Sequence, residues 1–168
     1  MVYLIRHGET DGGQKGAVPL NEKGIAQTKT VAPKVAQLGI THIYSSDVMR
    51  AKQTTEIINE TICVPVIFDQ RLREFSGLEK ISPEEFERNP EIMLESFNEA
   101  FERIKNFLSD LRRDRVDNVA IVTHRGIILT IMYAQKNDQI DFESFNKARL
   151  ETKADIRNCQ IIEFDLYT

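Results

Sequence analysis

The chain has 168 residues, of which 41% are hydrophobic and 29% are charged, and its net charge is -4. This length suits one compact domain over residues 1–168, and the composition is typical of a soluble globular protein rather than a disordered one. A net negative charge disfavours a nucleic-acid partner, because binding to a phosphate backbone needs a basic face. A small anionic ligand would have to be attracted by a local cluster of cations.

No segment approaches the ~20 apolar residues that a membrane-spanning helix needs, and Met1 leads straight into a predicted strand. We therefore expect a cytoplasmic protein with no membrane partner. Cys63 and Cys159 stand far apart in apolar surroundings. This pattern favours reduced, buried thiols over a disulfide framework. The sequence does not indicate an oligomeric state.

The first predicted strand, Val2 to Ile5, ends in a charged turn that begins with Arg6 and His7. In open α/β sheets, ligands bind beyond the carboxyl ends of the strands, so a histidine at this point can reach a substrate. Arg6 adds donors that suit phosphate or carboxylate groups. The glycine-rich stretch from Asp11 to Val18 predicts a loop, in which we interpret Lys15 as solvated, with substrate contact as the alternative.

The following segments alternate between predicted helices and strands. A helix begins after Asn21, a suitable N-cap, and Pro33 should kink it or interrupt its hydrogen bonds. Ile40 to Tyr44 reads as the second strand, and a helix from Val48 to Asn59 follows. Arg50 in its first turn would lie beside free backbone N–H groups, an arrangement suited to an anion. Taken alone, such an arginine is better interpreted as facing solvent.

Val64 to Phe68 is a third apolar run, short enough for a buried strand. From Ser82 to Asp114 the chain is predicted to be helical, with a break at Pro90. The apolar residues spaced along Phe97 to Leu111 form a stripe that we assign to the hydrophobic core rather than to a cofactor site.

A further strand, Asn118 to Thr123, ends in His124 and a glycine turn, which repeats the pattern of the first strand. Ile127 to Tyr133 resumes as an apolar helix. Two histidines that follow parallel strands can converge only if those strands are neighbours. The chain then continues through a short predicted helix around Phe142 to Ala148 and ends in a strand from Asn158 to Leu166, which we expect at a sheet edge.

Four ordered blocks together resemble the histidine phosphatase superfamily, the phosphoglycerate-mutase-like enzymes, and within it the short phosphatases. The blocks are Arg6-His7-Gly8-Glu9-Thr10, Tyr44 to Thr54, Arg71 to Glu79, and Val122-Thr123-His124 with its glycine turn. The resemblance spans nearly the whole chain. It implies an α/β fold, a three-layer α/β/α sandwich whose mostly parallel sheet has a C-terminal edge strand. It also implies that the two histidine-bearing strands are adjacent.

The resemblance further implies a role for each site residue. His7, Glu74 and His124 would be catalytic, with Glu74 as proton donor and Glu79 as the competing candidate, and Arg6, Arg50 and His124 would bind phosphate. The expected activity is hydrolysis of a phosphomonoester through a phosphohistidine at His7. Neighbouring cations would lower the pKa of His7 and keep it nucleophilic. We expect no metal or other cofactor, because the histidines lack zinc-site spacing and no Walker A motif occurs.

Departures from the family pattern leave the assignment open. The chain has no Trp, whereas many small phosphatases of this family show a Trp-Glu-Gly continuation in the region of Arg71 to Glu79. Gly13 stands where relatives often have an Asn that contacts phosphate, and Arg125 stands where a Gly is common. Arg125 would either add charge to the pocket or point into solvent.

The substrate would be a phosphorylated small molecule or a phosphoprotein. Only 50 positions separate Glu74 from His124, which leaves little room for a lid, so we expect a fairly open pocket. Two alternatives remain. One is a phosphoglycerate-type mutase, which must exclude water from its phosphorylated intermediate and so calls for a longer lid. The other is a phosphate-binding regulatory module with little turnover.

Overall fold

The computed structural model describes residues 1–11, 18–151 and 156–167, apart from the side chain of Glu79. The strands are β1 (Val2–Arg6), β2 (His42–Ser45), β3 (Val66–Phe68), β4 (Val119–Thr123) and β5 (Ile161–Phe164). The helices are α1 (Glu22–Ala36), α2 (Met49–Ile62), α3 (Ser76–Lys80), α4 (Pro83–Glu87), α5 (Pro90–Arg113), α6 (Arg125–Ala134), α7 (Phe142–Glu151) and the one-turn 3₁₀-helix η1 (Gln70–Leu72). No helix in the described ranges combines the length and the apolar composition needed to cross a membrane.

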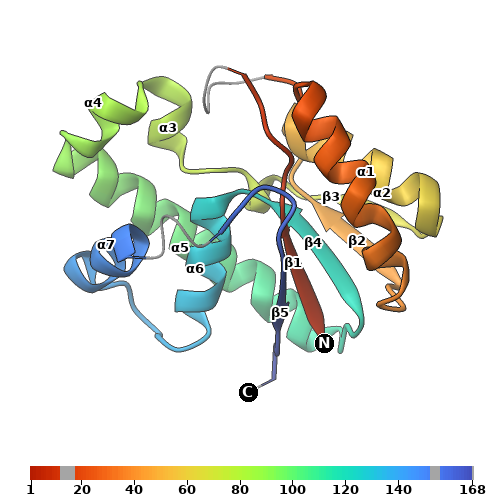
Figure 1. Cartoon of the computed structure of the whole chain (residues 1–168). Helices are drawn as coiled ribbons and strands as arrows, with labels where there is room; N and C mark the ends of the chain where they lie inside the picture. The colour runs from red at the N-terminus through yellow and green to blue at the C-terminus, as the bar shows by residue number, and fades with distance from the viewer. Residues whose placement is uncertain (12–17, 152–155, 168) are drawn as a thin grey trace.

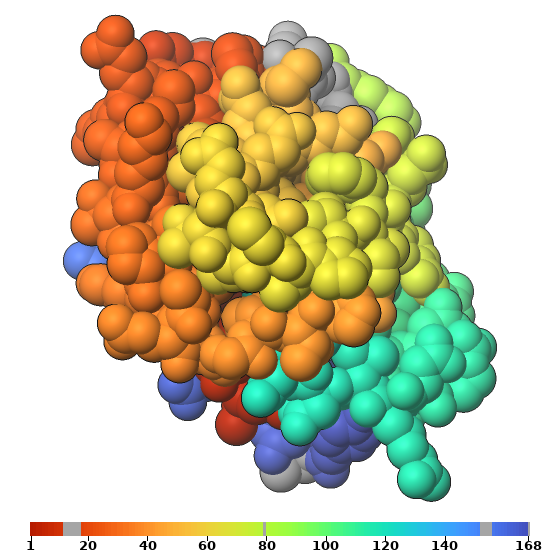
Figure 2. All heavy atoms as spheres, turned by 90° about the vertical axis from the view of Figure 1, so that its right-hand side faces the viewer, coloured from red at the N-terminus to blue at the C-terminus, as the bar shows by residue number. Residues whose placement is uncertain are grey.

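The strands form one sheet in the order β3-β2-β4-β1-β5 (Figure 1). β4 is parallel to β1 and β2, β3 is parallel to β2, and β5 is antiparallel to β1 at the edge. On one face α1 and α2 pack side by side (Figure 2), and α5 and α6 cover the other face. The predicted three-layer α/β/α sandwich, with a mostly parallel sheet and a C-terminal edge strand, is confirmed.

Alternation along the strands sends side chains into two separate cores. Leu4 and Ile121 belong to the core under α5 and α6, whereas Ile5 and Val122 belong to the core under α1 and α2. Every residue of β4 is buried, as expected for a central strand with helices on both faces. Burial on both faces fixes the register of β4, and this register sets the carboxyl ends of β1, β2 and β4 at one level.

The local sequence explains where the helices begin. Asn21 caps α1 as predicted, because its side chain accepts a hydrogen bond from the N–H of Gly24 at 2.7 Å. α1 continues past Pro33 to Ala36, so the proline lies inside the last turn and does not end the helix there. Pro90 is the first residue of α5, a position where the missing N–H costs no helical hydrogen bond.

The two cysteines are free thiols, as predicted, but the expectation that both are buried is wrong for one of them. Cys159 is 7% exposed. Cys63 is exposed because it is the C-cap of α2, where the backbone turns left-handed with φ of 51° and the chain leaves the helix at the surface.

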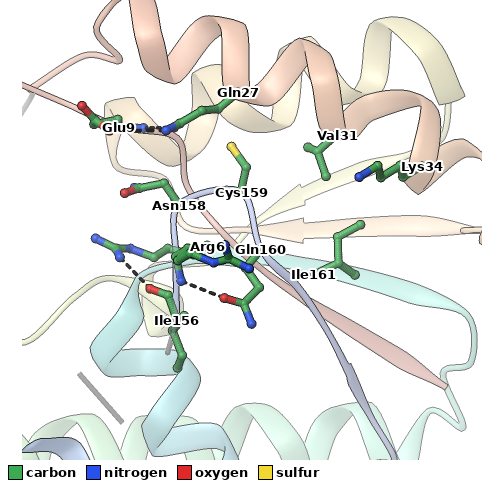
Figure 3. Close-up of a pocket in the computed structure, with 11 residues that line it drawn as sticks. Arg6, Glu9, Gln27, Val31, Lys34, Ile156, Asn158, Cys159, Gln160 and Ile161 are labelled. Atoms are coloured by element: carbon green, nitrogen blue, oxygen red, sulfur yellow. Dashed lines mark hydrogen bonds between the residues drawn. The ribbon is translucent and has the colours of Figure 1, made fainter. Parts of the chain in front are cut away.

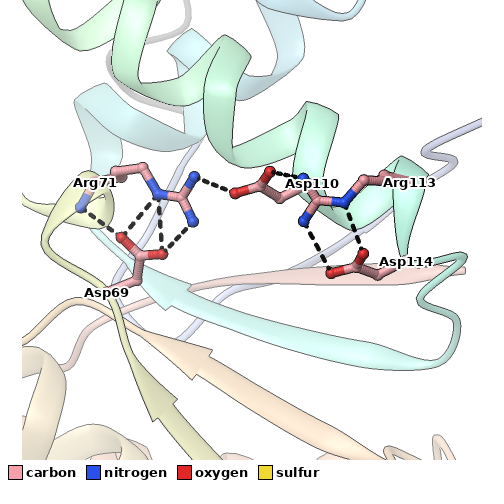
Figure 4. A network of polar contacts seen from close by, with 5 residues as sticks. All are labelled: Asp69, Arg71, Asp110, Arg113 and Asp114. Atoms are coloured by element: carbon pink, nitrogen blue, oxygen red, sulfur yellow. Dashed lines mark hydrogen bonds and ion pairs between the residues drawn. The ribbon is translucent and has the colours of Figure 1, made fainter.

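A cluster of ion pairs ties η1 to α5 (Figure 4). The guanidinium of Arg71 binds Asp69 and Asp110, each at 2.7 Å. Arg113 binds Asp110 at 2.9 Å and Asp114 at 3.0 Å. Because these charges are partly or mostly exposed, each pair adds little to the stability of the fold. Their main effect is to fix the direction of the segment that runs from β3 toward α3.

Candidate active site

The register of β1 against β4 brings the two predicted histidines together. Arg6 pairs with Thr123 in this parallel ladder, so the next residue of each strand, His7 and His124, leaves the sheet at the same level. The N–H of His7 also donates to the carbonyl oxygen of Thr123 at 3.0 Å. The two imidazole centroids lie 5.1 Å apart at an interplanar angle of 62°. The convergence expected from the sequence is therefore observed.

The contacts of His7 define which of its ring nitrogens carries the hydrogen. Nδ1 lies 2.7 Å from the carbonyl oxygen of Gly8, which can only accept, so Nδ1–H is the donor. Nε2 then has a lone pair, and the Nε–H of Arg50 donates to it at 3.3 Å. Burial, and secondly the charge of Arg50, lower the pKa of His7 from 6.5 to about 3. At neutral pH this imidazole is uncharged and its Nε2 can act as a nucleophile.

Arg50 is 1% exposed, so the solvent-facing interpretation that it would have in isolation is wrong. It lies in the first turn of α2, whose N-cap residue, Val48, makes no side-chain capping bond. Thr54, one turn later, accepts the N–H of Gly8 at 3.0 Å and donates to the carbonyl oxygen of Arg50 at 2.8 Å. These bonds join the start of α2 to the turn that carries His7, and they direct the positive end of the helix dipole toward the two histidines.

His124 is the N-cap residue of α6 and is completely buried. Its Nε2 lies 2.9 Å from Oγ of Ser46, and within the described ranges its Nδ1 is buried without a hydrogen-bond partner. Burial, followed by the charges of His7 and Arg50, lowers the pKa of His124 well below its usual value. The ring is therefore neutral as it stands, and the charge of a bound anion would favour its protonated form, which could donate to that anion.

Ser46 is not identified by the sequence beyond its place in a helix-start signal. It is the first residue after β2, and its N–H donates to the carbonyl oxygen of Val122 at 2.9 Å. Its position directly after a strand that borders β4 is the signal that could have identified it.

Glu74 is 2% exposed and lies beside the start of α6. One carboxylate oxygen accepts the N–H of Phe75 at 3.2 Å, and the other accepts the N–H of Gly126 at 3.3 Å. Arg103 on α5 donates to the backbone carbonyl of Glu74 at 2.8 Å and so fixes this part of the chain. Glu74 thus lies next to the turn that carries His124. The side chain of the competing candidate, Glu79, is outside the part of the chain that the structure describes.

Arg6 and Arg125 add positive charge to the same edge of the sheet. Arg6 donates from Nη1 to the carbonyl oxygen of Ile156 at 2.7 Å, while its Nε is buried without a partner in the described ranges. Burial and then the charge of Arg125 lower the pKa of Arg6. Arg125 is itself partly buried, and burial lowers its pKa while the charge of Glu74 raises it. Of the two orientations left open, the structure favours the one in which Arg125 adds charge to the site.

Asn158 is not predicted as a site residue, yet its side-chain N–H donates to the backbone carbonyl of His7 at 2.8 Å. The adjacent Cys159 donates its N–H to the carbonyl oxygen of Arg6 at 2.9 Å. Together they hold the end of β1 from the β5 side. No local pattern in the sequence signals this contact, because it joins residues 151 positions apart.

The remaining predictions concern the openness of the pocket and the loop that precedes α1. We expected a fairly open pocket, but the four predicted site residues at its centre are buried. Each is at most 4% exposed: His7, Arg50, Glu74 and His124. Lys15 and Gly13 lie outside the described residues. Within those residues, no group of three or more His, Cys, Asp or Glu side chains is placed to hold a metal ion.

Comparison with known proteins assigns the family. The family model for branch 1 of the histidine phosphatase superfamily matches residues 2–165. The chain belongs to the histidine phosphatase superfamily. The resemblance drawn from the four sequence blocks is thereby confirmed.

Among curated members of the superfamily, the chain is similar to the probable phosphoglycerate mutase GpmB of Escherichia coli O1:K1. The two are 44% identical over 81 residues, which is 45% of this chain and 38% of that protein. The chain thus matches well under half the length of that relative.

Solved structures share the fold over most of the chain. YhfR of Bacillus stearothermophilus superposes with a TM-score of 0.70 at 25% identity, covering 98% of this chain and 91% of that one. A mycobacterial glucosyl-3-phosphoglycerate phosphatase gives a TM-score of 0.69 at 21% identity, with coverage of 87% and 84%. The alpha-ribazole phosphatase of Shigella flexneri gives a TM-score of 0.67 at 21% identity, covering 87% of this chain and 83% of that one.

Proposed function

We propose that this member of the superfamily is a phosphomonoester hydrolase that works through a phosphohistidine at His7 and uses no metal ion. The observation that carries the proposal is the state of His7. It is buried and neutral, its Nδ1–H is bound to the carbonyl of Gly8, and its Nε2 lone pair lies beside Arg50 and His124. This arrangement suits attack on phosphorus, because nucleophilic catalysis by histidine needs an unprotonated ring nitrogen.

The charges around His7 suit a phosphoryl group. A phosphomonoester is a dianion at neutral pH, and its transfer needs cations or N–H donors around the equatorial oxygens. Arg6, Arg50 and Arg125 supply positive charge at this edge of the sheet, in a protein whose net charge is -4. The N-termini of α2 and α6 add backbone N–H donors at the same edge of the sheet.

In the first proposed step, Nε2 of His7 attacks phosphorus and the bond between phosphorus and the leaving oxygen breaks. Glu74, as the carboxylic acid, transfers its proton to that oxygen, so an alcohol leaves and Glu74 becomes a carboxylate. His124 and Arg50 stabilise the equatorial oxygens. The hydrogen bond from Nδ1–H to Gly8 keeps the imidazole oriented while its ring becomes positively charged.

In the second step, water attacks the phosphohistidine in line with the N–P bond. Glu74 takes a proton from this water, the N–P bond breaks, and the electron pair returns to Nε2 of His7. Inorganic phosphate leaves, and both His7 and Glu74 regain their starting states.

We propose a phosphorylated small molecule as the substrate class, with a phosphorylated protein side chain as the alternative. Because His7, Arg50 and His124 are buried, the substrate would have to present its phosphate on a group that can extend inward, which either class can do. Activity on a panel of sugar phosphates and on a phosphoprotein would separate the two.

The test is hydrolysis of p-nitrophenyl phosphate together with detection of the phosphoenzyme. We expect His7→Ala to abolish turnover and His42→Ala to leave it unchanged, since His42 is an exposed histidine near the opposite end of β2. Rapid quenching in alkali followed by mass spectrometry of peptides should find the phosphoryl group on the peptide that contains His7. Turnover that survives in His7→Ala, or a phosphoryl group on another residue, would contradict the proposal.

A mutase is the second candidate, and the similarity to the probable phosphoglycerate mutase of Escherichia coli favours it. A mutase would move phosphate between the positions of phosphoglycerate faster than it releases inorganic phosphate. Binding of phosphate without either reaction would instead indicate a regulatory module.

A further inference from the structure

A cavity of about 670 Å³ lies between α1 and the chain segment that leads into β5 (Figure 3). We call it the β5 cavity. Its size falls within the range typical of small-molecule sites. Arg6 lines one end, whereas His7, His124 and Glu74 are not part of its lining. A shallower hollow continues along α1 past Gln27 to Lys23.

The lining of the β5 cavity combines positive charge with an apolar wall. Lys34 extends from α1 and Arg6 lies across the cavity from it (Figure 3). Arg157 is the third cationic residue of the lining. The acidic residue of the lining, Glu9, forms an ion pair with Lys23 at 2.8 Å, which offsets its charge. The cavity is therefore electropositive in an acidic protein, which favours an anionic occupant.

The rest of the lining indicates what else the occupant would present. Val31 and Ile161 provide apolar contact, and the amide side chains of Gln27, Asn158 and Gln160 provide hydrogen-bonding groups. The polar surface of the lining exceeds its apolar surface, so an occupant would present its charge and hydrogen-bonding groups to most of the cavity and an apolar side to Val31 and Ile161.

The β5 cavity also adjoins the residues that hold His7. Asn158 lines it and donates to the carbonyl oxygen of His7, and Arg6 extends from the same turn. The Nε of Arg6 is buried without a partner in the described ranges, although its Nη1 binds the carbonyl of Ile156. An occupant would therefore contact the chain segment that positions the nucleophile.

From these observations we propose that the β5 cavity is a second binding site, separate from the histidines, for a small organic anion with an apolar body. The site does not depend on the proposed hydrolysis, because its lining supplies both the charge and the apolar contact. Its occupancy can be measured without turnover.

The experiment uses anilinonaphthalene sulfonate, a fluorescent anion with an apolar body, titrated into the full chain with and without orthovanadate as a competitor for the histidine site. We expect one bound dye per chain in both conditions. Lys34→Glu should weaken binding about tenfold or more, because it reverses a charge inside the cavity. Lys29→Glu is the matched control, since it makes the same charge change at an exposed position of α1 outside the lining.

The location of the dye is read independently by NMR. We expect its addition to shift the side-chain amide signals of Asn158 and Gln160 and to leave those of Asn137, which is not part of the lining, unchanged. Three results would overturn the proposal: loss of dye binding when orthovanadate is present, equal weakening by Lys34→Glu and Lys29→Glu, or several dyes bound per chain. Absence of phosphatase activity would leave the binding result intact, so the two proposals can fail separately.

Discussion

The reactivity of His7 depends on which of its two ring nitrogens carries the hydrogen. The carbonyl of Gly8 fixes that hydrogen on Nδ1, and Arg50 sits on the side of Nε2. Arg50 thus has two effects: it lowers the pKa of His7, and it places a guanidinium where the oxygens of a phosphoryl group would lie. Its removal should affect both the rate and the pH profile.

We predict that Arg50→Ala lowers kcat/KM for p-nitrophenyl phosphate by about 10²–10³, as loss of a donor to a charged transition state does. The acid limb of the pH profile should move to higher pH, because burial and then the charge of Arg50 depress the pKa of His7, and the variant loses the second of these effects. Steady-state kinetics across pH would measure both effects, with Arg88→Ala as an exposed control. Unchanged kinetics in Arg50→Ala would remove this residue from the site.

Asn158 acts on His7 through the backbone rather than through the ring. We predict that Asn158→Ala lowers kcat about fivefold with little change in KM, since the lost hydrogen bond is worth roughly 1 kcal/mol to the position of the nucleophile. Asn137→Ala is the matched control, because its amide donates to a backbone carbonyl of α6 at 2.9 Å. If both variants lose activity to the same extent, the loss in Asn158→Ala reflects lower overall stability and not a displaced His7.

At the scale of elements, the first turn of α6 organises the site. It follows His124 directly, its Gly126 N–H binds Glu74, and Arg125 extends from it toward the charges of Arg6 and Glu74. A Cβ atom at Gly126 would clash with the carboxylate of Glu74 and the ring of Phe75. The absence of a side chain at this position is what allows α6 and Glu74 to approach each other.

We predict that Gly126→Ala displaces Glu74 and therefore impairs proton transfer to the leaving group. Turnover of an alkyl phosphate such as glycerol phosphate should fall much more than turnover of p-nitrophenyl phosphate, whose leaving group departs without a proton. The same clash should lower the free energy of unfolding by about 1–3 kcal/mol. Met132→Ala, an exposed change on α6, is the control. Equal losses for both substrates would argue against Glu74 as the acid.

The elements that the sequence predicts best are those with a strong local pattern. β1 and β4 are apolar runs that end in His and Gly, so the residue pattern by itself identifies their ends as site-forming. α3 and η1 are not predicted, because five and three residues are too short to show a helical period. Pro33 is also a poor guide to the end of a helix, since α1 contains it in its last turn and continues to Ala36.

Site residues that depend on distant contacts are harder to predict. The burial of Arg50 requires the family pattern, because an arginine in a first helical turn normally faces solvent. The contact of Asn158 follows from the return of the chain along β1 as an antiparallel edge strand, which no local pattern encodes. The expected burial of Cys63 is wrong because its exposure depends on the exact residue at which α2 ends, and sequence patterns locate helix ends poorly.

At the scale of the whole molecule, the two buried histidines make stability depend on pH. Both have a pKa in the folded state below that of an unfolded histidine, about 3 for His7 and well below the usual value for His124. Their contribution to stability is therefore complete above the unfolded pKa of ~6.5 and is lost as pH falls from there toward about 3. Acid favours the unfolded chain because its histidines can bind protons.

We predict that the free energy of unfolding falls between pH ~6.5 and ~4 by up to about 1.4 kcal/mol per pH unit for each of the two histidines. Urea unfolding at several pH values would measure this slope. The variant that combines His7→Gln with His124→Gln should have a shallower slope, whereas His42→Gln should keep that of the parent protein. A double variant whose slope matches the parent would assign the acid sensitivity to other groups.

The order of the sheet has a consequence for how the protein is made. β1 and β2 follow one another in the chain, but β4 lies between them. A nascent chain on the ribosome that has not yet reached Val119 therefore lacks the strand that fills this gap, and the facing edges of two apolar strands stay open to wrong partners. When β4 pairs with β1 and β2, it fills this gap and also brings His124 beside His7. The two histidines therefore come together only when the sheet is complete between β2 and β1.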